Sequence, residues 1–384
     1  MRILLVSPLY PPDIGRLASY TKTIATRLQE HEEVSLLTYG TLPEAIPGVR
    51  IQTVPKTWPL LIRVVFFTLR LWWEARTADI LYVGDGASVG APAIIVGKLR
   101  HLPVIRFVLQ DEAWERAQSG NQSVYLSEAD YAQTDVPDRK IRRIRWLQRW
   151  VLRRATISIV PTLSLKTIFT RVYGAPLAKV HVLSYPLERR PLLPFTVERA
   201  SHQLFVPDPL HMGDGLERLL ECLPKLLKLF PSLHLFIANG HLATSLWKKQ
   251  VEILGVAEHV TFLGTISRAE KEYYYQSSSL LLLTHSIPDY SDEILQGYAA
   301  SIPIIATDVA GHQELIRHEK TGLLIPTGDA VVLQQAIQRG LTDEPLRTRM
   351  IQGGALLLKE RASLEQHLQE LHTLYKIIRN PSSV

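Results

Sequence analysis

The chain has 384 residues, of which 46% are hydrophobic and 21% charged, and its net charge is +6. A length of about two ordinary domains with this composition excludes long disorder, collagen and low-complexity fibres. The single cysteine, Cys222, excludes an internal disulfide and a multi-thiolate metal site, and it favours a reducing compartment. No apolar stretch reaches the roughly 20 residues of a membrane-spanning helix, and the first residues lack the apolar core of a signal peptide. We therefore expect a cytoplasmic protein whose positive charge favours an anionic partner.

The first half of the chain alternates short apolar runs with helical patterns. Expected strands lie at 3–6, 34–38, 51–54, 80–83 and 104–109, and expected helices at 17–31, 59–76, 93–99 and 139–154. In the helix at 59–76, Arg63, Arg70 and Glu74 share one narrow stripe and the remaining circumference is apolar. This pattern predicts a helix that is wedged against a sheet or lies in an interface. The alternation itself indicates right-handed βαβ units on an open parallel sheet.

The alternation restarts after residues 185–201, which hold three prolines and predict a linker. Expected strands then lie at 202–206, 233–238, 260–263, 279–283, 304–307 and 323–325, and expected helices at 216–230, 242–254, 268–276, 293–300 and 330–341. We therefore predict an α/β protein with an N-terminal domain at 1–184 and a C-terminal domain at 202–362. If the two domains face each other, a ligand crevice is expected at the carboxyl ends of their strands.

Several motifs follow one another in a characteristic order over nearly the whole chain. They are Ser7-Pro8-Leu9-Tyr10-Pro11-Pro12-Asp13-Ile14-Gly15, the segment 111–117, Ile159-Val160-Pro161-Thr162, Phe262-Leu263-Gly264, Pro303-Ile304-Ile305-Ala306-Thr307-Asp308-Val309-Ala310-Gly311, Glu314 and the segment 321–329. Each motif alone is weak, because a Gly-rich turn after a strand is common. Together they resemble the retaining family-4 glycosyltransferases, which use nucleotide sugars.

This resemblance implies the GT-B fold, with two facing Rossmann-like domains and a cleft between them. It implies transfer of a sugar from a nucleotide donor to a glycan, a lipid-linked or a small-molecule acceptor, without a resident cofactor. It also implies that residues 363–384 form a helix that packs back on the N-terminal domain. Such a transfer builds negative charge on the departing diphosphate, which preorganised cations and backbone amides stabilise. By the resemblance, Gly15 and Arg16 face the diphosphate, Gly264 the base and Gln296 the ribose.

The sequence departs from the family where the diphosphate is bound. The family's Arg falls on Asp208 or Pro209, its Lys on Asp214 and its first glutamate on Pro288. At about 4 Å and an effective dielectric of about 20, each contact between a carboxylate and the diphosphate costs about 4 kcal/mol. These substitutions leave it open whether the family's usual donor site is present.

Three interpretations of these departures stay open. The aspartates can be ordinary turn residues. Alternatively, Arg16 supplies the cation, and Asp289, Asp292 or Glu293 supplies the acid from a shifted register. Thirdly, Asp208 and Asp214 can hold a divalent metal, although we find no metal-ligand spacing. The main alternative to an enzyme is therefore a catalytically inactive homologue that binds a glycan, a lipid or an active transferase as a scaffold.

Asp111 and Glu115 are the candidate catalytic carboxylates, because the resemblance places this segment near the acceptor. At positions i and i+4 they share a helix face if a helix has begun there, and a solvated helix cap explains them equally well. The histidines at 181, 211, 285 and 312 are each more typical of structural or exposed residues.

Residues 139–154 predict a basic amphipathic helix. Its arginines, with Trp146 and Trp150 among them, gather opposite an apolar side. The candidate membrane-facing residues are Arg142, Arg145, Trp146, Arg149 and Trp150, because arginines beside tryptophans suit an anionic membrane. A solvated face, or one that clamps the linker, explains the pattern equally well. No nucleic-acid module accompanies it, so nucleic acid is not an expected partner. We expect a cytoplasmic protein, and under the membrane interpretation of this helix it is peripheral at the inner membrane face.

Overall fold

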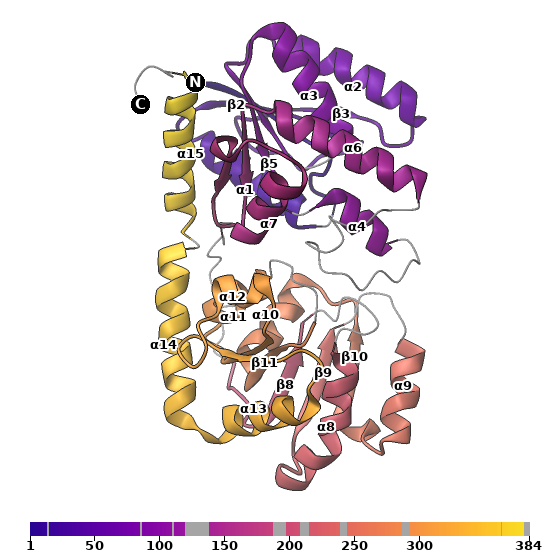
Figure 1. Ribbon diagram of the computed structural model, residues 1–384, viewed down its shortest axis with the longest axis vertical. Coiled ribbons are helices and arrows are strands. Elements are labelled where there is room, and N and C mark those ends of the chain that lie inside the picture. The colour runs from indigo at the N-terminus through magenta and orange to yellow at the C-terminus, as the bar shows by residue number, and fades with distance from the viewer. Residues whose placement is uncertain are drawn as a thin grey trace. The chain divides into compact units, whose positions relative to one another are not determined.

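Figure 1 shows the computed structural model, in which two compact units are formed by Met1–Pro186 with Leu364–Val384 and by Leu187–Ser363. The structure describes residues 1–13, 15–84, 87–109, 111–119, 138–186, 197–207, 215–238, 244–285, 292–361 and 363–379. Each unit is a parallel sheet with helices on both faces, so the predicted α/β class is confirmed.

The first unit contains a sheet in the order β3-β2-β1-β4-β5-β6-β7, in which all neighbours are parallel. Its strands are β1 (Arg2–Ser7), β2 (Glu33–Tyr39), β3 (Arg50–Val54), β4 (Ile80–Val83), β5 (Val104–Phe107), β6 (Ile157–Val160) and β7 (Val180–Val182). The chain order reverses between β1 and β4, and such a switch point opens a crevice at the carboxyl ends of the strands.

Helices cover both faces of this sheet. They are α1 (Arg16–Leu28), α2 (Leu60–Glu74), α3 (Ala87–Arg100), α4 (Glu112–Ser119), α6 (Arg139–Arg154), α7 (Leu163–Thr167), a π-helical turn η1 (Ile168–Val172), a 3-10 turn η2 (Leu177–Lys179) and α15 (Leu364–Arg379). Leu81 and Val83 pack in one core with residues of α2, α3 and α6. Tyr82, which alternates with them, contacts Tyr20 of α1 and Tyr375 of α15 on the other face.

Helix α2 is oriented opposite to the expectation for an amphipathic helix. Its polar stripe faces the unit: Arg63 donates to the carbonyl of Lys56 at 2.9 Å, and Arg70 donates to Gln52 at 2.6 Å. Glu74 is buried and pairs with Arg70 at 3.3 Å, and also with Arg50. Most of the apolar side is exposed instead. Phe67 and Leu71 of α2 nevertheless pack in the core of the sheet, so the helix contacts the sheet along one side and leaves most of its apolar residues exposed.

The second unit contains a six-stranded parallel sheet in the order β10-β9-β8-β11-β12-β13. Its strands are β8 (Gln203–Val206), β9 (His234–Ala238), β10 (Val260–Gly264), β11 (Leu280–Leu283), β12 (Ile304–Thr307) and β13 (Leu323–Ile325). Its helices are α8 (Leu216–Leu229), α9 (Thr244–Ile253), a 3-10 turn η3 (Ala257–His259), α10 (Arg268–Ser277), α11 (Asp292–Ala299), α12 (Ala310–Leu315), α13 (Ala330–Thr342) and α14 (Glu344–Arg361). The switch point lies between β8 and β11.

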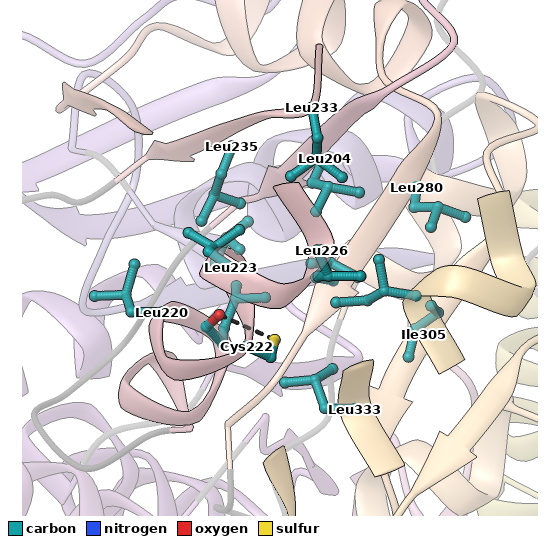
Figure 2. Packing of buried hydrophobic residues seen from close by; sticks show 14 of the residues in the cluster. Leu204, Leu220, Cys222, Leu223, Leu226, Leu233, Leu235, Leu280, Ile305 and Leu333 are labelled. Carbon is teal, nitrogen blue, oxygen red and sulfur yellow. Dashed lines mark hydrogen bonds between the residues drawn. The ribbon is translucent and has the colours of Figure 1, made fainter. Parts of the chain in front are cut away.

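The leucine-rich core of the second unit surrounds the cysteine (Figure 2). Cys222 lies on α8 among Leu220, Leu223 and Leu226, and its thiol donates to the carbonyl of Leu219 at 3.1 Å. Burial raises the pKa of the Cys222 thiol to about 12. The thiol therefore stays protonated and unreactive, as a small hydrophobic core residue does.

The C-terminal helix α15 is part of the first unit, where His367 connects it to two other segments. Nδ1 of His367 donates to the carbonyl of Ser184 at 3.0 Å, since a carbonyl can only accept. Nε2 then accepts from the hydroxyl of Tyr20 at 2.9 Å, and Tyr20 lies 2.5 Å from Tyr82. Burial lowers the pKa of His367 to about 4, so the ring is neutral at physiological pH.

Candidate functional site

The switch point of the second unit places a helix N-terminus at the carboxyl edge of its sheet. Gly215 precedes α8 with φ at 81°, a left-handed conformation that favours glycine. It packs so closely on the end of β11 that a Cβ atom there would overlap the carbonyl oxygen of Thr284. The first backbone N–H groups of α8 therefore begin beside the end of β11, and such a terminus suits an anionic ligand.

Helix α11 begins on the same edge with acidic residues. Glu293 accepts from Lys271 of α10 at 2.9 Å, and both side chains are largely buried. Gln296 lies three residues further on α11 and is half-buried, so Glu293 and Gln296 share one face of this helix. The pairing with Lys271 therefore orients the carboxyl group of Glu293.

Two buried histidines meet between the ends of β11 and β12. The rings of His285 and His312 lie 4.4 Å apart at 70°. Nδ1 of His312 donates to the carbonyl of Thr307 at 2.8 Å, and the hydroxyl of Thr307 donates to the carbonyl of His285. No local pattern indicates this pair, because His312 follows His285 by 27 positions in the chain. Only parallel pairing of β11 with β12 brings them together.

The carboxyl edge of the first unit carries the other predicted diphosphate residues. Gly15 has φ at 143° and precedes α1, and nothing lies within 4 Å of where its Cβ would be. Arg16 begins α1 and is half-buried, and its carbonyl accepts from the hydroxyl of Tyr185 at 3.3 Å.

Gly264, the predicted base-binding residue, ends β10 of the second unit with φ at 69°. As at Gly15, nothing lies within 4 Å of where its Cβ would be.

Asp111 is a fully buried helix cap. Its Oδ1 accepts from the backbone of Ala113 at 2.9 Å and of Trp114 at 3.3 Å, and its Oδ2 accepts from the hydroxyl of Tyr173. Burial raises the pKa of this carboxyl, and the three hydrogen bonds and the charge of Arg145 oppose that rise. The predicted cap is therefore buried and not solvated. Glu115 is exposed on α4, so the two carboxylates lie in different environments.

Several residues of the predicted donor site fall outside the part of the chain that the structure describes. Asp208, Asp214 and Asp289 lie outside the described residues, as do Pro209 and Pro288. Within the described ranges, no group of three or more His, Cys, Asp or Glu side chains could hold a metal ion.

The predicted membrane-facing residues of α6 do not all lie outward. Arg142, Trp146 and Arg149 are exposed, whereas Arg145 and Trp150 are half-buried. The positive charge of Arg145 acts to lower the pKa of Asp111. The guanidinium of Arg154 lies 4.7 Å from the centre of the Trp150 ring. No described helix is both long and apolar enough to cross a membrane.

Each unit has a parallel sheet whose strand order reverses at a switch point, which defines a doubly wound α/β protein. Proteins of this class bind their ligands at the carboxyl ends of the strands. A family model described as Glycosyl transferase 4-like domain matches residues 17–186, and one described as Glycosyl transferases group 1 matches residues 204–356. The two matches fall in the first and second unit respectively. The chain therefore belongs to the family-4-like glycosyltransferases.

Individual relatives match parts of the chain. The putative glycosyltransferase EpsD of Bacillus subtilis is 26% identical over 215 residues, which are 53% of this chain and 56% of EpsD. Phosphatidyl-myo-inositol mannosyltransferase of Mycobacterium leprae is 27% identical over 146 residues, which are 37% of each chain. The matches thus span about half of the first relative and a smaller share of the second.

A solved structure matches the whole chain in fold. HepE of Anabaena in complex with UDP superposes with a TM-score of 0.74 over 98% of this chain and 100% of its own, at 14% identity. The fold of the chain is therefore that of the GT-B glycosyltransferases.

Proposed function

We propose that the protein transfers a sugar from a nucleoside diphosphate sugar to an acceptor. The main support comes from the carboxyl edge of the second unit, where Gly215 packs the N-terminus of α8 against Thr284 at the switch point. Backbone N–H groups at such a terminus stabilise the negative charge of a departing diphosphate. The family membership and the UDP in the HepE crystals support a nucleotide-sugar donor.

The family resemblance assigns the remaining roles in this proposal to residues of each unit. Arg16 provides the cation for the diphosphate, and Gly264 leaves room for the base. Gln296 binds the ribose, and Glu293, oriented by Lys271, faces the donor sugar. A permanently charged guanidinium matches phosphate geometry.

A lipid-linked or glycan acceptor completes the proposal, with the protein peripheral at the inner membrane face. The name of one relative, phosphatidyl-myo-inositol mannosyltransferase, includes a phospholipid. The exposed Arg142, Trp146 and Arg149 on α6 support a location at an anionic surface.

Calorimetry with UDP and GDP, each with and without Mg²⁺ or Mn²⁺, tests the donor site. We expect one of the nucleotides to bind, and the Arg16→Ala protein to bind it at least about tenfold more weakly, because a charged hydrogen bond is lost. Arg27→Ala is the matched control on the same helix, since Arg27 pairs with Glu30, three residues along the chain, at 3.1 Å.

Three outcomes separate the alternatives. Undiminished binding by the Arg16→Ala protein removes Arg16 from the site. Binding that requires Mg²⁺ or Mn²⁺ favours a site built around a divalent metal. If no nucleotide binds and none raises the melting temperature, the protein is an inactive homologue that serves as a scaffold.

A further inference from the structure

The outward face of α2 is a continuous apolar surface. Leu69 is 62% exposed and Trp73 59% exposed. The other exposed apolar residues of this face are Leu60, Leu61, Ile62, Val65 and Phe66. A helix whose apolar side faces water is unfavourable, and an apolar patch of this kind indicates an interaction surface.

The surface continues onto α3, which packs beside α2. Ile95 and Leu99 of α3 are exposed, and Lys98 is exposed between them. Two arginines lie over aromatic rings at the rim: Arg100 is 3.8 Å from the ring of Trp72 and Arg76 is 3.9 Å from that of Trp73. Arginine side chains that stack on aromatic rings therefore lie at the border of the apolar face.

Helix α6 lies on the other side of α3, on the same face of the sheet (Figure 1). Half of its residues are arginine or lysine and none is acidic. Trp146 is 65% exposed among them, and Arg139, Arg142, Arg143 and Trp146 line an open pocket on the surface of this helix. In α2, α3 and α6 together the one acidic residue is Glu74, which is buried and paired.

We propose that the surface formed by α2, α3 and α6 binds an anionic lipid bilayer. The apolar face of α2 inserts among the acyl chains, and the arginines of α6 bind the lipid phosphates. A helix of 15 residues is about 22 Å long, which is too short to span the bilayer but suits a helix that lies in its interface. An acid-free cationic border around an apolar strip matches phosphates above acyl chains.

This proposal deepens the peripheral location of the proposed function by assigning the membrane-binding surface, and it does not depend on sugar transfer. Vesicle binding is measured without nucleotide or acceptor. Vesicle binding without nucleotide binding would support this inference and contradict the proposed sugar transfer. Nucleotide binding without vesicle binding would support sugar transfer and contradict this inference.

The first test is cosedimentation with vesicles of phosphatidylcholine alone and with about one third phosphatidylglycerol. We expect at least about tenfold tighter binding to the anionic vesicles, and loss of that advantage as salt screens the charges. The Val65→Glu/Leu69→Glu double variant should bind at least about tenfold more weakly, because carboxylates are placed on the inserting face. Both residues are exposed, so the variant is expected to keep the wild-type melting temperature.

Leu177→Glu is the matched control. Leu177 is 66% exposed and precedes β7, at the opposite edge of the sheet from β3, and a glutamate introduced there should leave vesicle binding unaltered.

The second test measures insertion directly. Cys222 is buried with its thiol pKa raised to about 12, so a cysteine introduced at Leu69 can be labelled selectively with an environment-sensitive fluorophore. We expect a blue shift on anionic vesicles and quenching by lipids that carry spin labels in the acyl chain. The same label at Leu177→Cys should show neither.

Several results would overturn the proposal. These are equal binding of the wild-type and double-variant proteins to anionic vesicles, no blue shift at position 69, and equal binding to neutral and anionic vesicles. A dimer in solution that the double variant dissociates, without vesicle binding by either protein, would instead assign α2 to contacts between copies of this chain.

Discussion

Asp111 lies at the carboxyl edge of the first sheet, but its hydrogen bonds describe a structural residue. Both carboxylate oxygens accept hydrogen bonds from the protein, and none of the side chain is exposed. A group that must exchange protons with a substrate needs access to it. The geometry therefore favours the cap over the catalytic role that the family resemblance suggested for this position.

Two substitutions separate these roles. Asp111→Asn keeps an oxygen that can cap α4, and we expect its free energy of unfolding to stay within about 1 kcal/mol of wild type with sugar transfer retained. Asp111→Ala removes the cap and should cost about 1–2 kcal/mol in urea unfolding. A loss of turnover of about 100-fold or more in Asp111→Asn at unchanged stability would restore the catalytic role.

At the scale of elements, the junction between α8 and β11 positions the proposed donor edge. Gly215 is required there twice, by its left-handed φ and by its close approach to Thr284. Turn patterns in the sequence indicate a glycine before a helix, but they do not indicate which distant strand the glycine contacts. That information comes only from the strand order, in which β11 lies beside β8.

Gly215→Ala is expected to destabilise the protein by about 2 kcal/mol or more, because the methyl group adds overlap to the cost of a left-handed residue. Gly255→Ala is the matched control. Gly255 has φ at 67° with nothing within 4 Å of its Cβ position, so only about 1–2 kcal/mol of backbone cost applies. Equal losses in urea unfolding would contradict the importance of the Thr284 contact.

At the scale of the whole molecule, the last helix of the chain completes the core of the first unit. Tyr375 of α15 is fully buried against Tyr82, and His367 links Tyr20 to Ser184. Burial raises the pKa of Tyr375 well above its usual value, so this cluster stays uncharged at neutral pH. Residues more than 340 positions apart thus stabilise one unit.

The neutral state of His367 makes the stability of this unit depend on pH. Its pKa is about 4 in the folded protein and 6.5 without the fold, so the unfolded chain binds more protons between these values. The free energy of unfolding should fall by about 3 kcal/mol as pH drops from 6.5 to 4, and His367 should have no effect above that window.

Urea unfolding across this pH range tests the linkage. His367→Gln cannot titrate but keeps a donor and an acceptor, so its stability should depend less steeply on pH, by about one proton. Identical slopes for the two proteins would show that the charge of His367 does not control the stability of α15.

The sequence by itself determined the two-unit α/β class, most strands and the basic character of α6. Continuous apolar runs predict strands that are buried on both faces, and the spacing of polar residues predicts helices, because these periodicities are local. The order of family motifs identified the fold, since the same turns recur at the ends of the same strands. The sequence also identified Gly15, Arg16, Gly264 and Gln296, which remain predictions.

Tertiary structure decided which side of α2 faces water, because Arg70 and Glu74 find partners on β3, at Gln52 and Arg50. It also brought His285 to His312 and paired Lys271 with Glu293. Such pairings depend on strand order and on helix packing across the sheet, which no local pattern encodes. Burial, and with it the chemistry of Asp111 and His367, is likewise a property of the assembled fold.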